Sequence, residues 1–161
     1  MKAPVIVAVV VGIVGGLYSG IHLLIPLVLT GAVWWALRRL FPARPADFVA
    51  AAAVQIGHLL WFAIALSIMG ALTVDLVDIA ILLGGSVWLL ARPGLAALVV
   101  LTTYHALALL LNLAAFLNFP IGHNLHKALL IHILWRVLAL VFMWRGWSRA
   151  RRAAEVLEEI A

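Results

Sequence analysis

The chain has 161 residues, of which 67% are hydrophobic and only 11% are charged. Soluble domains are typically about half apolar and about a quarter charged, so this chain has too few polar residues to cover a globule in water. The same composition excludes an intrinsically disordered chain. The sequence therefore predicts an integral membrane protein that contacts the lipid bilayer.

The net charge is +5, and the basic residues lie between apolar runs. This placement indicates membrane topology and contact with anionic headgroups, and it argues against a nucleic-acid partner. The absence of cysteine excludes disulfides and thiolate metal sites. The N-terminus resembles a signal peptide, but no clear cleavage site follows and the apolar sequence continues. We therefore expect a retained first span.

The first apolar stretch runs for 34 residues, from Pro4 to Leu37. As a single helix it would be about 51 Å long, which exceeds a hydrocarbon core of about 30 Å. The pairs Gly15-Gly16 and Ser19-Gly20 offer a turn near its middle. We predict two helices, at roughly 4–17 and 21–38, and a single helix over residues 4–38 is the alternative.

Four more spans follow, separated by short segments rich in proline and glycine. They are predicted at roughly 47–69, 72–91, 94–117 and 124–145. The predicted fold is thus an all-α bundle of six transmembrane helices, arranged as three antiparallel hairpins with short loops. Residues 1–147 form this bundle, and residues 148–161 are predicted to be a short cytoplasmic amphipathic helix.

The positions of the basic residues support this count. Nine Lys and Arg residues fall at the termini or in the second and fourth loops, whereas only Lys127 falls in the opposite set of loops. This bias predicts six spans in an inner or plasma membrane with both termini cytoplasmic. A five-helix topology would move only Lys2 and the amino terminus outside, so it is a second possibility. Gly12, Gly16 and Gly20 would permit close helix packing, so a homo-oligomer or a larger membrane complex is expected.

Ionisable side chains are costly inside a bilayer, so they usually face the protein interior and often mark function. His58 and His105 each lie about 11 residues into their predicted helices, and Arg136 is at a similar depth near the midplane. Helical spacing places the polar residues of each span on one stripe. The four stripes are Gln55 with His58, Asp75 with Asp78 and Ser86, Thr102 with His105 and Asn112, and His132 with Arg136. We expect these stripes to meet around a polar cavity in the outer half of the bundle.

His58 and His105 admit three interpretations. Each is a buried neutral imidazole bonded to a neighbour such as Thr102 or Gln55, or a member of a proton or cation relay. Alternatively, the two are the axial ligands of a b-type haem, because they lie at one depth on parallel helices. The haem interpretation rests on an analogy of layout, and no sequence motif accompanies it.

Arg136 keeps its charge in a protein and needs an acceptor, and Asp78 is the best intramembrane carboxylate. The pair is either a structural ion pair or part of a site for an anionic ligand or a gating charge. A divalent metal site is a further hypothesis, because imidazole and carboxylate ligands recur at helical spacing near the outer rim. Its candidate ligands are His22, His123, His126 and Asp75, with His132 and Asp78 nearby.

Phosphate-binding loops, zinc-protease motifs and hydrolase nucleophile motifs are missing from the sequence. An enzyme, for example one that acts on lipids, is therefore the least favoured class. The favoured function is a small transporter or channel, linked to protons or cations, with a site at His58, His105, His132, Arg136, Asp78, Asn112 and Gln55. The first alternative is an electron-transfer subunit that binds haem b at His58 and His105. The second is an accessory or assembly subunit whose polar groups only pair helices.

Overall fold

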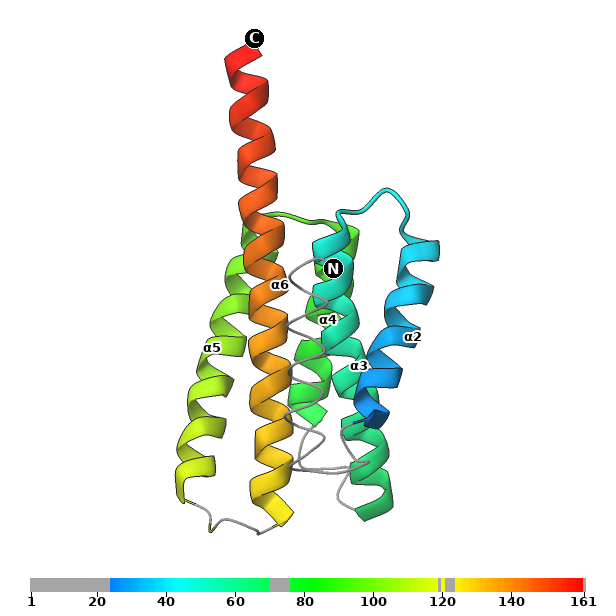
Figure 1. Cartoon of the computed structure of the whole chain (residues 1–161), viewed down its shortest axis with the longest axis vertical. Helices are drawn as coiled ribbons and strands as arrows, with labels where there is room; N and C mark the ends of the chain where they lie inside the picture. The colour runs from blue at the N-terminus through cyan, green and yellow to red at the C-terminus, as the bar shows by residue number, and fades with distance from the viewer. Residues whose placement is uncertain (1–23, 70–75, 119, 121–123, 161) are drawn as a thin grey trace.

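A computed structural model describes residues 24–69, 76–118, 120 and 124–160 of the chain (Figure 1). These residues form five α-helices and no strand, which confirms the all-helical fold. The helices are α2 (Leu24–Leu40), α3 (Ala46–Met69), α4 (Leu76–Ala91), α5 (Leu95–Asn118) and α6 (Asn124–Ile160). The predicted helix at 4–17 lies outside the described residues, so six spans and three hairpins are not confirmed.

The helix ends follow local turn chemistry. Pro45 cannot donate a backbone hydrogen bond, and its carbonyl accepts from the amides of Phe48 and Val49 at 3.1 Å in the first turn of α3. Gly94 precedes α5, and its carbonyl accepts from the amide of Leu98 at 3.2 Å. Both helices therefore begin within one residue of the predicted starts at 47 and 94.

Helix α3 lies at the centre of the described bundle. It packs against α2, α4 and α6, and α5 packs mainly against α6. The core between these helices is apolar and contains fully buried residues such as Val49, Leu89, Leu101 and Trp135. This arrangement places one face of α3 directly opposite α6, which is where the polar side chains meet.

Three of the described helices are long and apolar enough to cross a membrane. The qualifying segments are Ala46–Ile64, Leu95–Asn118 and His126–Arg152, and α4 is apolar over the shorter segment Val77–Ala91. Large apolar side chains on the outside of α5 are exposed, among them Leu110, Leu111 and Leu117. An outer surface of this kind is typical of helices that contact lipid, and it supports the predicted membrane character.

Helix α6 differs from the prediction in one respect, because it does not end near residue 145. It continues without a break to Ile160 and projects beyond the bundle (Figure 1). Gly146 lies just past the predicted end of this span, and a Cβ at this glycine would clash with the ring of Phe48. Gly146 is therefore a packing residue inside α6, and residues 148–160 extend the same helix.

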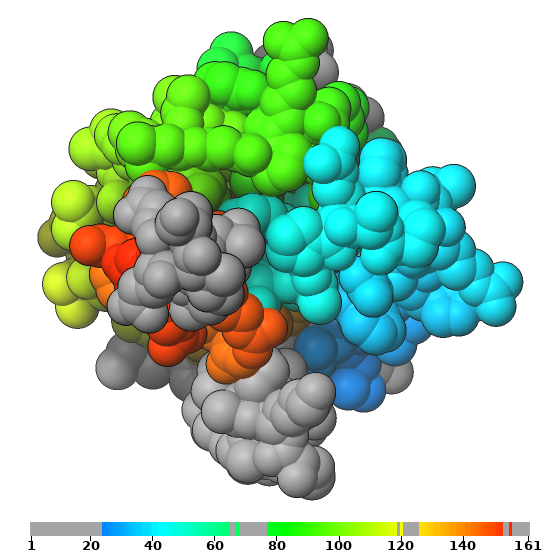
Figure 2. Space-filling view, turned by 90° about the horizontal axis from the view of Figure 1, so that it is seen from above, coloured from blue at the N-terminus to red at the C-terminus, as the bar shows by residue number. Residues whose placement is uncertain are grey.

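The basic residues of the described loops gather at one end of the bundle. The α2–α3 and α4–α5 connections lie side by side at this end, next to the emerging part of α6 (Figures 1 and 2). Arg44 donates from Nη2 to the carbonyl of Ala91 at 2.9 Å, and Arg38 donates from Nη1 to the carbonyl of Arg44 at 3.1 Å. We call this end, with Arg38, Arg44, Arg92 and Arg145, the basic end.

Candidate functional site

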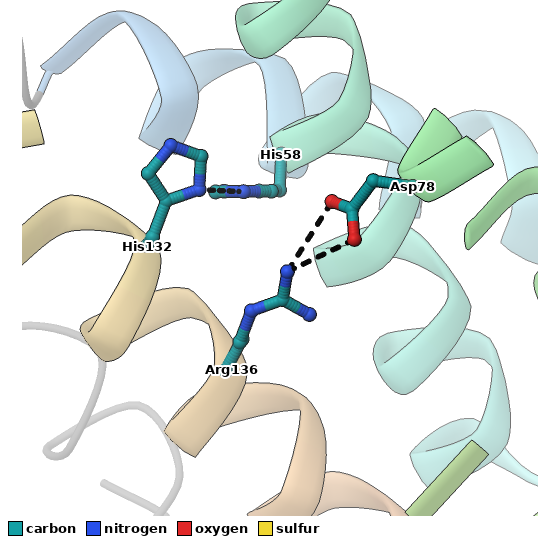
Figure 3. A network of polar contacts seen from close by, with 4 residues as sticks. All are labelled: His58, Asp78, His132 and Arg136. Carbon is teal, nitrogen blue, oxygen red and sulfur yellow. Dashed lines mark hydrogen bonds and ion pairs between the residues drawn. The ribbon is translucent and has the colours of Figure 1, made fainter. Parts of the chain in front are cut away.

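A buried ion pair joins α4 to α6. The Nη2 atom of Arg136 lies 3.2 Å from both carboxylate oxygens of Asp78 (Figure 3). The Arg136 side chain is only 6% exposed, whereas that of Asp78 is 24% exposed. The structure thus contains the ion pair that the sequence proposes, and the carboxylate is its more accessible member.

A pair of histidines lies beside the ion pair. The Nε2 atom of His58 on α3 is 2.8 Å from the Nδ1 atom of His132 on α6 (Figure 3). One ring donates and the other accepts, so the pair shares a single hydrogen-bonding proton. Phe62 stacks on His58 and meets the edge of His132, with ring centroids 6.3 and 5.0 Å away. The aromatic ring therefore fixes the orientation of both imidazoles.

Sequence reasoning predicted a different partner for His58. It named Thr102 or Gln55, whereas the partner in the structure is His132. Thr102 is exposed on the outer face of α5. Gln55 is used elsewhere: its Oε1 accepts from the hydroxyl of Ser86 at 3.3 Å, and its Nε2 donates to the carbonyl of Ala51 at 3.3 Å. Helical spacing shows which residues share a face, but it does not show which helices face each other.

A cavity of about 10 Å³ lies where α3, α4, α5 and α6 meet. This volume is enough for about one water-sized occupant. Its lining residues are Val54, Gln55, His58, Leu82, His105, Trp135, Arg136 and Ala139. Of the predicted stripes, Gln55 and His58 of α3, His105 of α5 and Arg136 of α6 thus face a common interior point, and Asp78 reaches Arg136 from α4.

Several buried polar atoms around this cavity have no hydrogen-bond partner among the described residues. They are Nδ1 of His58, both ring nitrogens of His105, and Nε and Nη1 of Arg136. His105 is only 2% exposed. Buried polar groups are normally hydrogen-bonded, because an unpaired one costs about 1–3 kcal/mol. Each such group in a folded protein calls for an explanation, for example an ordered water or ion at that position.

Arg136 also contacts an aromatic ring on α5. Its guanidinium carbon lies 5.2 Å from the centroid of the Tyr104 ring, a favourable distance for a cation–π interaction. The Tyr104 ring in turn meets that of His105 at 5.4 Å, and its hydroxyl has no partner among the described residues. Arg136 is thus held between the carboxylate of α4 and the aromatic face of α5.

Asn112 does not line the cavity. It is half-buried on α5, about two turns beyond His105, and its Nδ2 atom has no partner among the described residues. The structure therefore separates it from the other predicted site residues, and its predicted part in the site is not tested.

The proposed metal ligands His22, His123 and Asp75 lie outside the described residues. His126 is described: it is buried, and its ring stacks on Phe116 at 3.8 Å. Within the described ranges, no group of three or more His, Asp or Glu residues is placed to hold a metal ion. The metal hypothesis thus gains no support from this part of the chain.

The haem hypothesis requires His58 and His105 to flank a porphyrin. Both histidines line the cavity, but its volume is only about 10 Å³, and the Nε2 atom of His58 is bonded to His132. A macrocycle would have to push α3 and α5 apart to reach both rings. The haem hypothesis stays a prediction, and this geometry does not favour it.

A second ionic cluster, at the basic end, was missed by sequence reasoning. Asp47 in the first turn of α3 is 6% exposed and pairs with Arg145 and Arg149 of α6. The distance from Oδ1 of Asp47 to Nε of Arg145 is 3.4 Å. The available signal was an isolated acidic residue at the start of an apolar helix, where the helix dipole also favours a negative charge.

No protein-family model matches the chain, and no curated protein or solved structure matches it either. A function must therefore follow from the residues and their geometry.

Proposed function

We propose that this chain is a small membrane transporter or channel that moves protons through its helical bundle. The groups that carry the proton are His58, His132 and His105, together with the Asp78–Arg136 ion pair. The main supporting observation is that three helices bring the buried side chains of His58, His105 and Arg136 to one small cavity, and that Asp78 of a fourth helix is ion-paired with Arg136. Such groups are expensive inside a membrane, and they commonly mark an ion or proton path.

The chemistry of the cavity favours protons over metal cations. Among the described residues no carboxylate lines it, and the lining residues contribute one fixed positive charge, that of Arg136. A metal cation would be repelled by this charge, and the Asp78 carboxylate is already paired with Arg136. A proton, in contrast, binds to imidazole or carboxylate and can pass between them along short hydrogen bonds. The bond of 2.8 Å between His58 and His132 is one such step.

The proposed topology has six spans, with the basic end of the bundle in the cytoplasm. The arginines of the described loops lie at this end, as the positive-inside rule requires. Both termini are then cytoplasmic, in an inner or plasma membrane. We also propose that the protein assembles as a homo-oligomer or within a larger membrane complex, because a bundle of this size has a small interior.

A second candidate function is an accessory subunit that only packs against partners. One observation favours it: the Asp78–Arg136 ion pair and the His58–His132 hydrogen bond each join two helices, as simple helix pairing would require. The two candidates differ in flux. The accessory subunit moves no ion, whereas the transporter does.

The test is proton flux into liposomes that contain the purified protein and an internal pH-sensitive dye. An acid pulse outside is expected to acidify the lumen faster than in empty liposomes. The His58→Ala and His105→Ala variants are each expected to acidify the lumen only at the leak rate of empty liposomes. His126→Ala is the matched control, because this histidine of α6 stacks on Phe116 and does not line the cavity. Unchanged flux in both cavity variants would remove the proposal.

A further inference from the structure

The Asp78–Arg136 contact leaves most of the guanidinium unused. Both carboxylate oxygens share the single nitrogen Nη2, each at 3.2 Å, instead of forming two parallel bonds to two nitrogens (Figure 3). The Nε and Nη1 atoms have no partner among the described residues. Because Arg136 is 6% exposed, water at the surface does not satisfy these donors.

The unpaired atoms around the cavity are suited to an acceptor with negative charge. A guanidinium only donates, and each neutral imidazole offers one N–H. Arg136, His58 and His105 all line the cavity, whereas no carboxylate in the described part of the chain does. A small anion would therefore meet several donors and one positive charge. The cavity volume of about 10 Å³ limits the occupant to about the size of a water molecule, so only a monatomic anion is small enough to be considered.

The charge balance of the buried layer links such an anion to a proton. With Asp78 ionised, Arg136 is already neutralised, and a buried anion would add an uncompensated negative charge. If a proton binds to the Asp78 carboxylate, an O–H bond forms, and the ion pair is replaced by a lone guanidinium. An anion in the cavity then restores neutrality. The other titratable groups of this layer among the described residues are His58 on α3, His105 and Tyr104 on α5, and His132 on α6.

We propose that this cavity binds a small monovalent anion, and that the anion enters together with one proton, which binds to Asp78. The proposal rests on the proposed function and names its second substrate. Asp78 is the accessible member of the ion pair, so the proton reaches it first. Release is the reverse: the proton leaves Asp78, the ion pair forms again, and the anion is expelled.

The wild-type protein in liposomes gives the first test, with chloride as the probe and gluconate as the large anion that does not fit. Acid-driven proton uptake is expected in chloride and should fall to the leak of empty liposomes in gluconate. Equal uptake in both media would overturn the anion site and leave proton transport standing. No uptake in either medium would overturn the proposed function and this proposal together.

A binding test without transport uses Asp78→Asn, which carries the neutral state of the carboxyl permanently. Its thermal unfolding midpoint in detergent is expected to be higher in chloride than in gluconate at equal ionic strength, whereas the wild-type midpoint should be the same in both. Asp47→Asn is the matched control, because it removes a buried ion-paired aspartate away from the cavity. An equal chloride effect on both variants, or none on Asp78→Asn, would overturn the proposal.

Discussion

At the scale of single residues, the molecule depends on pairs of polar groups that satisfy each other in an apolar interior. His58 is 3% exposed, and its Nε2 atom is bonded to His132. A buried polar atom that loses its partner bears the full cost of desolvation, whereas replacing both partners by apolar groups of similar shape can be nearly neutral. This asymmetry separates the structural role of the pair from its function.

Removing one member of the histidine pair should therefore cost more than removing both. We expect His132→Leu to lower the free energy of unfolding by about 1–3 kcal/mol, because it leaves the Nε2 atom of His58 without a partner. The double variant His58→Leu/His132→Leu should be more stable than the sum of the single effects predicts. Denaturant titration of all four proteins in detergent gives the coupling, and strict additivity would contradict a direct bond between the two rings.

The cluster at the basic end makes a smaller, graded prediction. Asp47 forms ion pairs with two arginines, Arg145 and Arg149. The side chain of Arg149 is 56% exposed, and it contributes only one of these two ion pairs. Arg149→Ala should cost no more than about 1 kcal/mol, the usual upper value for an exposed ion pair. Asp47→Ala should cost more than Arg149→Ala, since it removes both contacts and the favourable charge in the first turn of α3. The free energies of unfolding of both variants are compared in the same detergent. A larger loss for Arg149→Ala than for Asp47→Ala would show that the ionic cluster is not centred on Asp47.

At the scale of helices, a glycine sets the distance between α2 and α3. A Cβ at Gly57 would lie 2.7 Å from the Cα and 2.9 Å from the N of Thr30, which are backbone atoms of α2. The hydroxyl of Thr30 accepts a hydrogen bond of 3.3 Å from the indole of Trp135, so α2 is also attached to α6 here. Moving α2 away would therefore disturb two helix contacts.

We expect Gly57→Ala to lower the free energy of unfolding by about 1–3 kcal/mol, the usual cost of overpacking a tight contact. Gly31→Ala is the matched control, because no atom of another described helix lies within 4 Å of its Cβ position. Alanine there should be neutral or should stabilise the helix by up to about 1 kcal/mol, from its higher helix propensity. Thermal unfolding of both variants measures these changes in stability. Equal changes for Gly57→Ala and Gly31→Ala would contradict the close approach of α2 to α3.

The same scale shows what the sequence can and cannot predict. Pro45 and Gly94 carry local signals, so the starts of α3 and α5 were predicted within one residue. The last span was predicted to end near residue 145, whereas α6 continues to Ile160 and Gly146 admits the ring of Phe48 on another helix. The His58–His132 bond was missed for the same reason: it depends on which helices are neighbours, and helical periodicity carries no such information.

At the scale of the whole molecule, the described helices have two ionic layers in which α6 pairs with another helix. One lies at the basic end around Asp47, and the other lies at the cavity around Asp78. The candidate residues on α3, α4 and α6 could be found from the sequence because ionisable groups are rare in these apolar segments. The cavity itself could not be found, since its lining depends on the packing of four helices.

The chain has no cysteine, so single introduced cysteines report its orientation directly. Ala150 lies on α6 beyond the basic end, and Asn118 is the last residue of α5 at the opposite end. Both side chains are exposed, so each residue is a suitable position for a single cysteine. The positive-inside rule predicts that a membrane-impermeant maleimide labels Asn118→Cys on intact cells. Ala150→Cys should react only after the membrane is opened, and the opposite pattern would reverse the proposed topology.

The proposed function is proton movement through the buried polar groups, beyond a role in holding helices together. It is tested most directly by proton flux through the double variant His58→Leu/His132→Leu, which is expected to remain folded. Proton uptake into liposomes should fall to the leak of protein-free vesicles, although the unfolding midpoint stays near that of the wild type. Uptake at the wild-type rate in this folded variant would show that the histidine pair only joins α3 to α6, and it would contradict the account.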